Sequence, residues 1–264
     1  MFTKVETKEI ALEMKGLFSF DWDETILSKH MNKIILQAFN IHNKKDIEAM
    51  LALPNIEEKI WAIASQIEPR GKATEWKALF EKLIEDNHHI SIATYGQFPE
   101  LIRRYLKDKI NLSEDVVSKI HIVCYMYPSD VGNGKNRHIE ESIAHFKRDK
   151  NNTIVVLVED SQENLDAAVS AGKLHPNGAV LAPKDEKDQS PTNPNMFITT
   201  PHISKVLELS EQLKKEISIY QAVAKTQSEK SLFGNTLCTF KPAPKAQEEA
   251  QQPEALQINS ANLT

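Results

Sequence analysis

The chain is poor in cysteine and aromatic residues and carries no large excess of one charge. Its two cysteines, Cys124 and Cys238, lie in an apolar run and in a polar segment, so neither a disulfide framework nor a paired-thiol metal site is expected. The formal net charge of −5 leaves no basic patch of the kind that binds nucleic acid or an anionic membrane surface. These absences favour a protein of a reducing compartment with no nucleic-acid partner.

Long apolar stretches are also missing. No run approaches the roughly 18 consecutive apolar residues that a transmembrane helix needs. Residues 1–16 have mixed charge rather than the apolar core of a secretion signal. We therefore expect a soluble, cytoplasmic protein without a transmembrane segment. Hydrophobic residues still make up 41% of the 264 residues, which is enough for a buried core.

What the sequence does contain is a series of short apolar runs separated by helical patterns. Runs that are apolar on both faces are typical of buried parallel strands, and helices between them indicate βαβ units. The pattern predicts an α/β fold, with a Rossmann-like doubly wound parallel sheet. The expected strands are residues 17–20, 90–93, 120–126, 153–158 and, more weakly, 179–182.

The segment between the first two strands is too long for one crossover helix. Residues 28–72 hold several helical patterns and no strand, so they are predicted to form a small helical, cap-like insertion. We expect one domain over residues 1–225. Its last helix, at 202–225, has an apolar stripe that includes Tyr220 and packs against the sheet or forms a homodimer. Residues 226–264, rich in Pro, Gln and Glu, are predicted to be a disordered tail.

Two carboxylates follow the first expected strand. Asp21 and Asp23 come directly after Phe20, at the carboxyl end of the strand, where ligands bind in parallel sheets. Strand alternation would point both side chains to one side and Trp22 to the other. We expect Asp21 and Asp23 to share a crevice, with Trp22 packed in the core.

Four motifs that follow one another in the required order resemble those of the haloacid-dehalogenase (HAD) superfamily. Each lies where an expected strand ends or a helix begins, and together they span residues 16–182. They are residues 21–25 (DWDET), Thr94 after the second strand, Lys135 before a helix at 137–146, and the pair Glu159-Asp160 with Asn164 on the next turn. A single such motif is common in unrelated proteins, whereas all four in order indicate a HAD-like fold.

The resemblance implies a Mg²⁺-dependent phosphohydrolase that cleaves a phosphomonoester through a phospho-aspartate. Asp21 would attack phosphorus and also ligate the metal. Asp23 would give its backbone carbonyl to the metal, and its side chain would be the general acid and then the general base. Asp160 would complete the metal site.

The resemblance also assigns the phosphate-binding groups. The Thr94 hydroxyl and the backbone N–H of Tyr95 would bind phosphate oxygens, and Lys135 would neutralise both the phosphate and the nucleophile. Glu159 and Asn164 are expected to lie behind the metal ligands. His138, one turn beyond Lys135, is expected on the surface.

The natural substrate and two rival functions stay open. A small insertion that leaves the crevice accessible favours a phosphoprotein, including a phosphotyrosine protein, whereas a closing lid favours a small metabolite. A phosphotransferase with an organic acceptor and a non-catalytic binding protein with the same fold are the alternatives. The Glu-rich tail resembles the secretion signals of some bacterial effectors delivered into host cells, and an ordinary disordered tail has the same composition.

Overall fold

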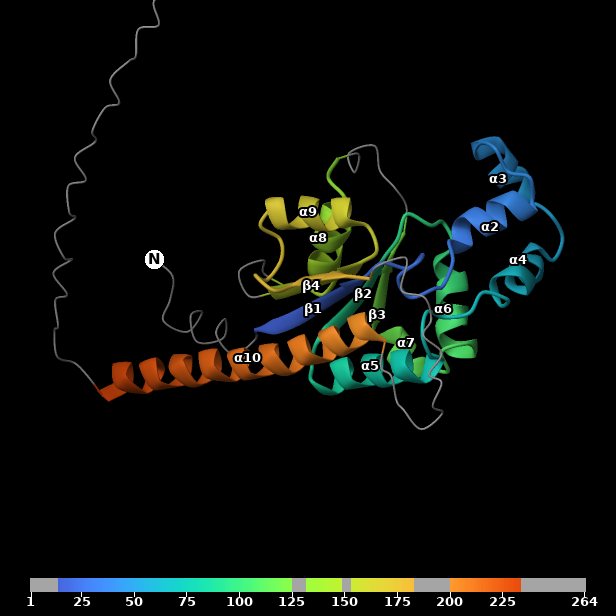
Figure 1. Ribbon diagram of the computed structural model, residues 1–264. Coiled ribbons are helices and arrows are strands. Elements are labelled where there is room, and N and C mark those ends of the chain that lie inside the picture. Colours follow the sequence, from blue (N-terminus) through green and yellow to red (C-terminus); the bar gives the residue numbers. More distant parts are fainter. Residues whose placement is uncertain (1–13, 125–131, 149–152, 183–199, 234–264) are drawn as a thin grey trace, which may run out of the picture.

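The computed structural model describes residues 14–124, 132–148, 153–182 and 200–233. Its five strands form one parallel sheet in the order β3-β2-β1-β4-β5. The strands are β1 (Lys15–Phe20), β2 (His89–Ala93), β3 (Ile120–Val123), β4 (Thr153–Glu159) and β5 (Ala179–Leu181). Helices cover both faces of the sheet (Figure 1), so the predicted α/β fold with a doubly wound parallel sheet is confirmed.

All of the described helices except α6 and α7 fall into three groups. Helices α5 and α10 cover one face of the sheet, α8 and α9 cover the other, and α2, α3 and α4 lie beyond its carboxyl edge (Figure 1). Their bounds are α2 (Met31–Ala38), α3 (Lys44–Leu51), α4 (Ile56–Ala64), α5 (Ala73–Glu85), α6 (Pro99–Asp108), α7 (Glu114–Ser118), α8 (Asn136–His145), α9 (Gln162–Ser170) and α10 (Pro201–Phe233). None of the described helices combines the length and apolar character needed to span a bilayer.

The central strand β1 is buried on both sides because its side chains alternate between two cores. Phe18 and Phe20 belong to the larger core under α5 and α10, whereas Leu17 packs with residues of α8 and α9. Phe20 lies edge-on to Trp76 and Phe80 of α5, with ring centroids 6.0 and 5.4 Å away. This packing fixes the end of β1, where the chain enters the carboxyl edge.

Trp22 also packs as predicted. Its side chain is buried and lies edge-on to Tyr105 of α6, with a centroid distance of 5.4 Å. The Tyr105 hydroxyl donates a hydrogen bond of 2.6 Å to the carbonyl of Ile67. The residue between the two expected catalytic carboxylates therefore anchors the loop in the core.

The insertion predicted at residues 28–72 contains the short helices α2, α3 and α4. Arg104 of α6 fixes α4 to the body of the domain: its guanidinium contacts Glu58 at 2.7 Å and lies 4.4 Å from the ring centre of Trp61. Whether these helices close over the crevice as a lid stays a prediction.

The predicted end of the last helix is wrong. Helix α10 begins at Pro201 and continues to Phe233, so residues 226–233 are helical rather than part of a disordered tail. The physical reason is that this stretch contains neither proline nor glycine, the residues that most disfavour a helix. Residues 234–264, the rest of the predicted tail, lie outside the described part of the chain.

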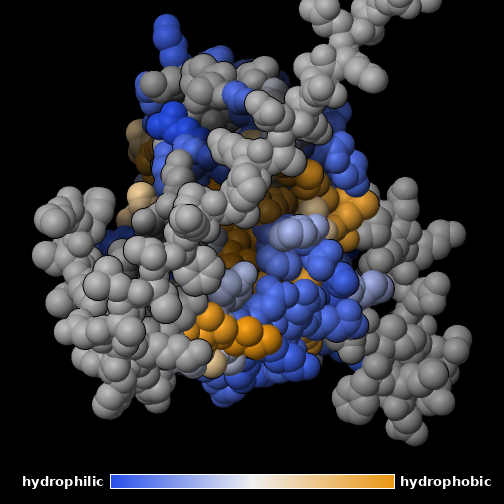
Figure 2. Space-filling model, turned by 90° about the vertical axis from the view of Figure 1, so that its left-hand side faces the viewer, coloured by the Kyte–Doolittle hydropathy of each residue, from blue (hydrophilic) through white to orange (hydrophobic). Residues whose placement is uncertain are grey.

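The apolar stripe of α10 also differs from the prediction. Leu209 is buried against the sheet, whereas Tyr220 is 58% exposed. In Figure 1 the second half of α10 projects past the sheet, away from the core of the domain. Figure 2, which views this end of the molecule, shows hydrophobic side chains among hydrophilic ones. A homodimer through this helix stays a prediction.

Candidate active site

The site lies where the order of the strands reverses. After β1 the chain builds β2 and β3 on one side, and β4 returns to the other side of β1. In sheets of this kind the carboxyl ends of the strands border a ligand-binding crevice at such a reversal. The backbone N–H of Asp21 donates to the carbonyl of Val158 in β4 at 2.8 Å. The hydrogen bonds between β1 and β4 therefore place Asp21 at the edge of the sheet that borders the crevice.

Lys135 reaches into this crevice from the turn before α8. Its ammonium is 2.9 Å from Asp21 Oδ1 and donates to the carbonyl of Ala93 at 2.8 Å. The ring of Tyr95 covers the same ammonium, with its centre 4.0 Å away. Because the Lys135 side chain is only 1% exposed, it serves as a fixed positive charge beside Asp21.

Burial and the neighbouring charges have opposite effects on the pKa values of Asp21 and Lys135. Burial raises the pKa of Asp21 to about 6, although the ion pair with Lys135 opposes the rise. Burial alone would lower the pKa of Lys135, but the carboxylates of Asp21 and Glu159 outweigh it and raise that pKa. At neutral pH both groups are charged, so Asp21 is available as a nucleophile.

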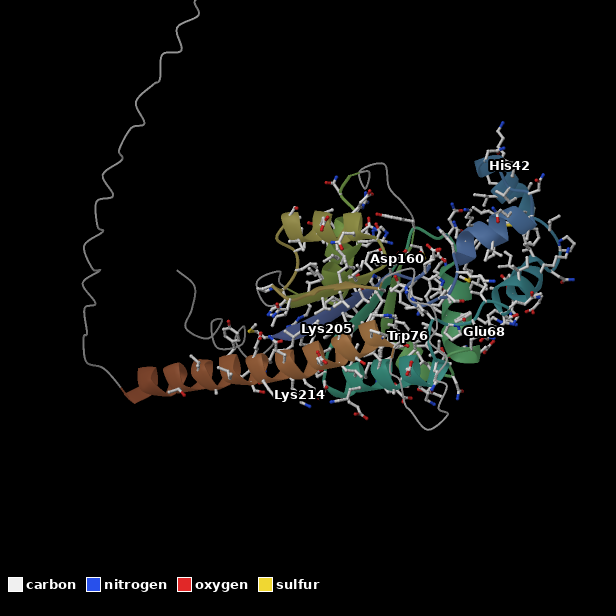
Figure 3. The ribbon with its side chains drawn as sticks, viewed as in Figure 1. His42, Glu68, Trp76, Asp160, Lys205 and Lys214 are labelled. Atoms are coloured by element: carbon white, nitrogen blue, oxygen red, sulfur yellow. The ribbon has the colours of Figure 1, made fainter. Side chains whose placement is uncertain are left out.

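Asp21 is also one of three carboxylates that lie close together. One oxygen each of Asp21, Glu159 and Asp160 lies within 4.8 Å of the others, and Figure 3 shows Asp160 at the carboxyl edge, near the insertion. Burial, followed by the charge of Asp21, raises the pKa of Glu159 to about 9. Its Oε2 is buried without a partner among the described residues. Such crowded hard oxygens fit a divalent cation such as Mg²⁺.

The raised pKa of Glu159 leads to a prediction about metal binding. Below about pH 9 the metal-free carboxyl holds a proton, which a nearby cation would expel. We expect Mg²⁺ affinity to rise by up to about tenfold per pH unit near neutrality, with proton release. Calorimetry in buffers of different protonation enthalpy measures both quantities.

The matched variant for this test is Glu159→Gln, which cannot release the proton. It should flatten the pH dependence of Mg²⁺ binding. Without metal, the same carboxyl lowers stability as pH rises. It ionises near 4.5 when unfolded and near 9 when folded, so the unfolded state is favoured progressively between these values. An Mg²⁺ affinity independent of pH would contradict this account.

The Asp23 carboxylate contacts the start of the insertion. Its Oδ1 accepts the backbone N–H of Met31 at 2.7 Å, and its Oδ2 lies 3.1 Å from His30 Nδ1. Asp23 thus caps the first turn of α2. Its hydrogen bond with the His30 side chain raises the pKa of that imidazole. The general acid expected from the sequence is therefore held at the start of the insertion in this structure.

Thr94 and Tyr95 lie at the end of β2. The backbone N–H of Thr94 donates to the carbonyl of Val123 at 2.9 Å, and its hydroxyl accepts the N–H of Gly96 at 3.0 Å. The Tyr95 ring lies edge-on to His138, with a centroid distance of 5.4 Å. His138 is fully buried, so its expected surface position is wrong. The first turn of α8 faces the sheet, and Tyr95 covers the imidazole.

Asn164, in α9, approaches the loop that carries Lys135. Gly134 has a φ of +54°, and a Cβ there would come within 3.0 Å of the Asn164 Cα. Only glycine fits this contact without strain. Asn164 therefore packs against the loop that carries Lys135, and its predicted role stays a prediction.

The predicted site residues thus gather at one edge of the sheet, where the Asp23 side chain contacts the start of the insertion. Sequence reasoning missed two residues that contact this region. His30 had no distinguishing signal, because a lone histidine before a helix is usual. Arg70 lies 46 positions from Glu24, which it contacts, so no local pattern connects them.

No family model matches the chain, and no curated protein matches it. Among solved structures, the Legionella pneumophila effector Ceg4 is 17% identical, with 74% of this chain and 94% of that chain covered and a TM-score of 0.42. CbbY from Rhodobacter sphaeroides in complex with phosphate is 13% identical over 61% and 84% of the two chains, with a TM-score of 0.38. A HAD-superfamily hydrolase from Ehrlichia chaffeensis is 13% identical over 60% and 85%, with a TM-score of 0.35.

These likenesses are weak, because every TM-score lies below 0.5, so they add nothing to the assignment of the site. The site is defined by its own side chains. The described residues form a doubly wound parallel α/β domain whose switch point holds a buried lysine, an aspartate and two further carboxylates.

Proposed function

We propose that the chain is a Mg²⁺-dependent phosphohydrolase of the HAD type, with Asp21 as its phosphorylated nucleophile. The proposal rests on the two sets of neighbours that surround the Asp21 carboxylate. Asp21 is ion-paired with the buried Lys135 and also lies within 4.8 Å of the oxygens of Glu159 and Asp160. A carboxylate between a fixed cation and a cation-binding cluster is suited to attack an anionic phosphate.

In the first half of the reaction, transfer of the phosphoryl group to Asp21, each polar group of the site would have a distinct role. Asp21, Asp160 and the backbone carbonyl of Asp23 would hold Mg²⁺, which neutralises charge on the phosphate. Lys135 orients Asp21, and the Thr94 hydroxyl and the Tyr95 N–H bind phosphate oxygens. An Asp21 oxygen bonds to phosphorus while the bond between phosphorus and the leaving oxygen breaks.

Asp23 supplies and recovers the proton. Its carboxyl protonates the leaving oxygen, and the alcohol or phenol departs. The Asp23 carboxylate then takes a proton from a water molecule that attacks the phosphorus of the phospho-aspartate. The bond from Asp21 to phosphorus breaks, which restores the carboxylate and releases inorganic phosphate. For this role Asp23 must turn from Met31 and His30 toward the substrate.

The substrate is a phosphomonoester, either a phosphoprotein, including a phosphotyrosine protein, or a small metabolite. The chain would act in the cytoplasm of its cell or, as an effector delivered into a host cell, in the cytoplasm of that host. A phosphotransferase with an organic acceptor and a binding protein without turnover are the rival functions. No described feature of the crevice favours either of them.

A substrate panel tests the proposal. Aryl phosphates, sugar phosphates, nucleotides and phosphotyrosine and phosphoserine peptides are assayed for phosphate release with Mg²⁺ and with excess chelator. We expect Mg²⁺-dependent release of inorganic phosphate from at least one class. A new phosphate ester in place of free phosphate would establish the phosphotransferase, and Mg²⁺ binding without turnover on any substrate would establish the binding protein.

A further inference from the structure

Arg70 is a buried guanidinium at the end of the helical insertion. Only 8% of the residue is exposed. Its Nη1 donates to the carbonyl of Glu24 at 2.6 Å and to the carbonyl of Ala182 at 3.0 Å. Its Nη2 has no partner among the residues that the structure describes. Burying a charge against carbonyl oxygens alone does not favour folding, which points to a role other than stability.

The turn that Arg70 holds has an unfavourable backbone conformation. Glu24 has a φ of +60°, in the left-handed region that residues with a side chain rarely adopt. The N–H groups of Ile26 and Leu27 both donate to the carbonyl of Trp22 at 3.1 Å, which closes the turn. Such a conformation persists only where its surroundings fix it, and the Arg70 hydrogen bond to the Glu24 carbonyl does so.

Arg70 is itself fixed by two backbone contacts. Its N–H donates to the carbonyl of Ile26 at 2.8 Å, and its carbonyl accepts the indole N–H of Trp76 at 2.7 Å. Trp76 is fully buried in α5. The guanidinium is therefore held by the core rather than by a flexible surface segment.

The second carbonyl connects Arg70 to the acidic cluster. Ala182 follows β5, and its N–H donates to the carbonyl of Glu159 at 2.9 Å. One nitrogen of Arg70 thus links the turn after Asp23 to the segment that is hydrogen-bonded to Glu159. These are the two halves of the site, from the ends of β1 and β4.

We propose that Arg70 is a positioning residue for the phosphohydrolase reaction. By holding the Glu24 carbonyl it fixes the peptide between Glu24 and Thr25, one residue after Asp23, and so limits the directions from which Asp23 approaches the crevice. This role rests on the proposed function. It differs from a structural role because it acts on the proton transfer by Asp23, which matters most when the leaving group is poor.

The test compares Arg70→Met, which keeps an aliphatic stem and loses the donors, with Arg70→Lys, which keeps a charged donor. Leu213→Ala, a fully buried residue of α10 away from the site, is the control for general destabilisation. For each full-length variant, kcat and KM are measured on aryl phosphates with good and poor leaving groups. Hydrogen exchange of the Met31 amide, which donates a hydrogen bond to Asp23, reports on the conformation of the turn after Asp23. This measurement does not require catalysis.

In Arg70→Met, kcat should fall about 10- to 100-fold more for the poorest leaving group than for the best, with little change in KM. Met31 should lose protection from exchange, and Arg70→Lys should recover part of both effects. Equal losses for all leaving groups, or a pattern like that of Leu213→Ala, would overturn the proposal. If the wild type shows no Mg²⁺-dependent hydrolysis, the proposed function is wrong. In that case the exchange experiment still tests the positioning role, which unchanged protection of the Met31 amide in Arg70→Met would overturn.

Discussion

Replacing Asp21 with asparagine is expected to lower kcat for Mg²⁺-dependent phosphate release by about 10⁴-fold or more. The reason is chemical, because a neutral amide is a poor nucleophile and a weak metal ligand. The side chain keeps its size and can still accept a hydrogen bond from Lys135, whose ammonium is 2.9 Å from Asp21 Oδ1. Phosphate release from the best substrate of the panel, with and without Mg²⁺, measures the effect.

The chain offers a matched control in Asp86. Its side chain is 2% exposed and lies 2.6 Å from Lys82, but it joins α5 to α10 at the opposite, amino-terminal end of the strands from the site. Asp86→Asn should lower the melting temperature and retain near wild-type kcat. If Asp21→Asn retained turnover while Asp86→Asn lost it, the nucleophile would lie elsewhere.

Replacing Lys135 with methionine is expected to lower kcat/KM by about 10²- to 10³-fold, the usual loss when one charged group that stabilises a developing negative charge is removed. The pH profile should change as well. Lys135 holds the pKa of Asp21 down against the effect of burial, and that pKa is about 6 with the lysine present. Without Lys135 it rises, so the acidic limb of the kcat/KM profile should move to higher pH.

A lysine outside the site provides the comparison. Lys173 is partly buried and lies 2.6 Å from Glu140 of α8. Lys173→Met should leave both the rate and the acidic limb unchanged. A uniform loss of rate in Lys135→Met without any shift of the limb would mean that Lys135 acts on the phosphate alone and does not tune Asp21.

The layout of the sheet was predictable because short apolar runs need burial on both faces. The observed strands β1, β2 and β4 begin or end within two residues of the predicted runs. The edge that holds the site was predictable for the same reason, since parallel strands end together. Asp21 and Thr94 each follow a strand, and the register of β1 with β2 brings them to one edge.

Contacts that cross the fold could not be predicted. Arg70 reaches Ala182 over 112 positions, and nothing in either local sequence marks the pair. The burial of His138 depends on how Tyr95 covers α8, which a helical pattern does not contain. The orientation of Asp23 toward Met31 depends on where the insertion begins relative to the turn. In each case the deciding interaction is between side chains brought together only by the folded chain.

Direct detection of the phosphorylated residue tests the central claim. Wild type turning over a radiolabelled phosphomonoester is quenched in acid, and the peptide that carries the label is identified after protease digestion. The proposed mechanism predicts hydroxylamine-sensitive label on Asp21, dependent on Mg²⁺ and absent from Asp21→Asn. Label on another residue, or full turnover with no labelled protein at any quench time, would contradict it.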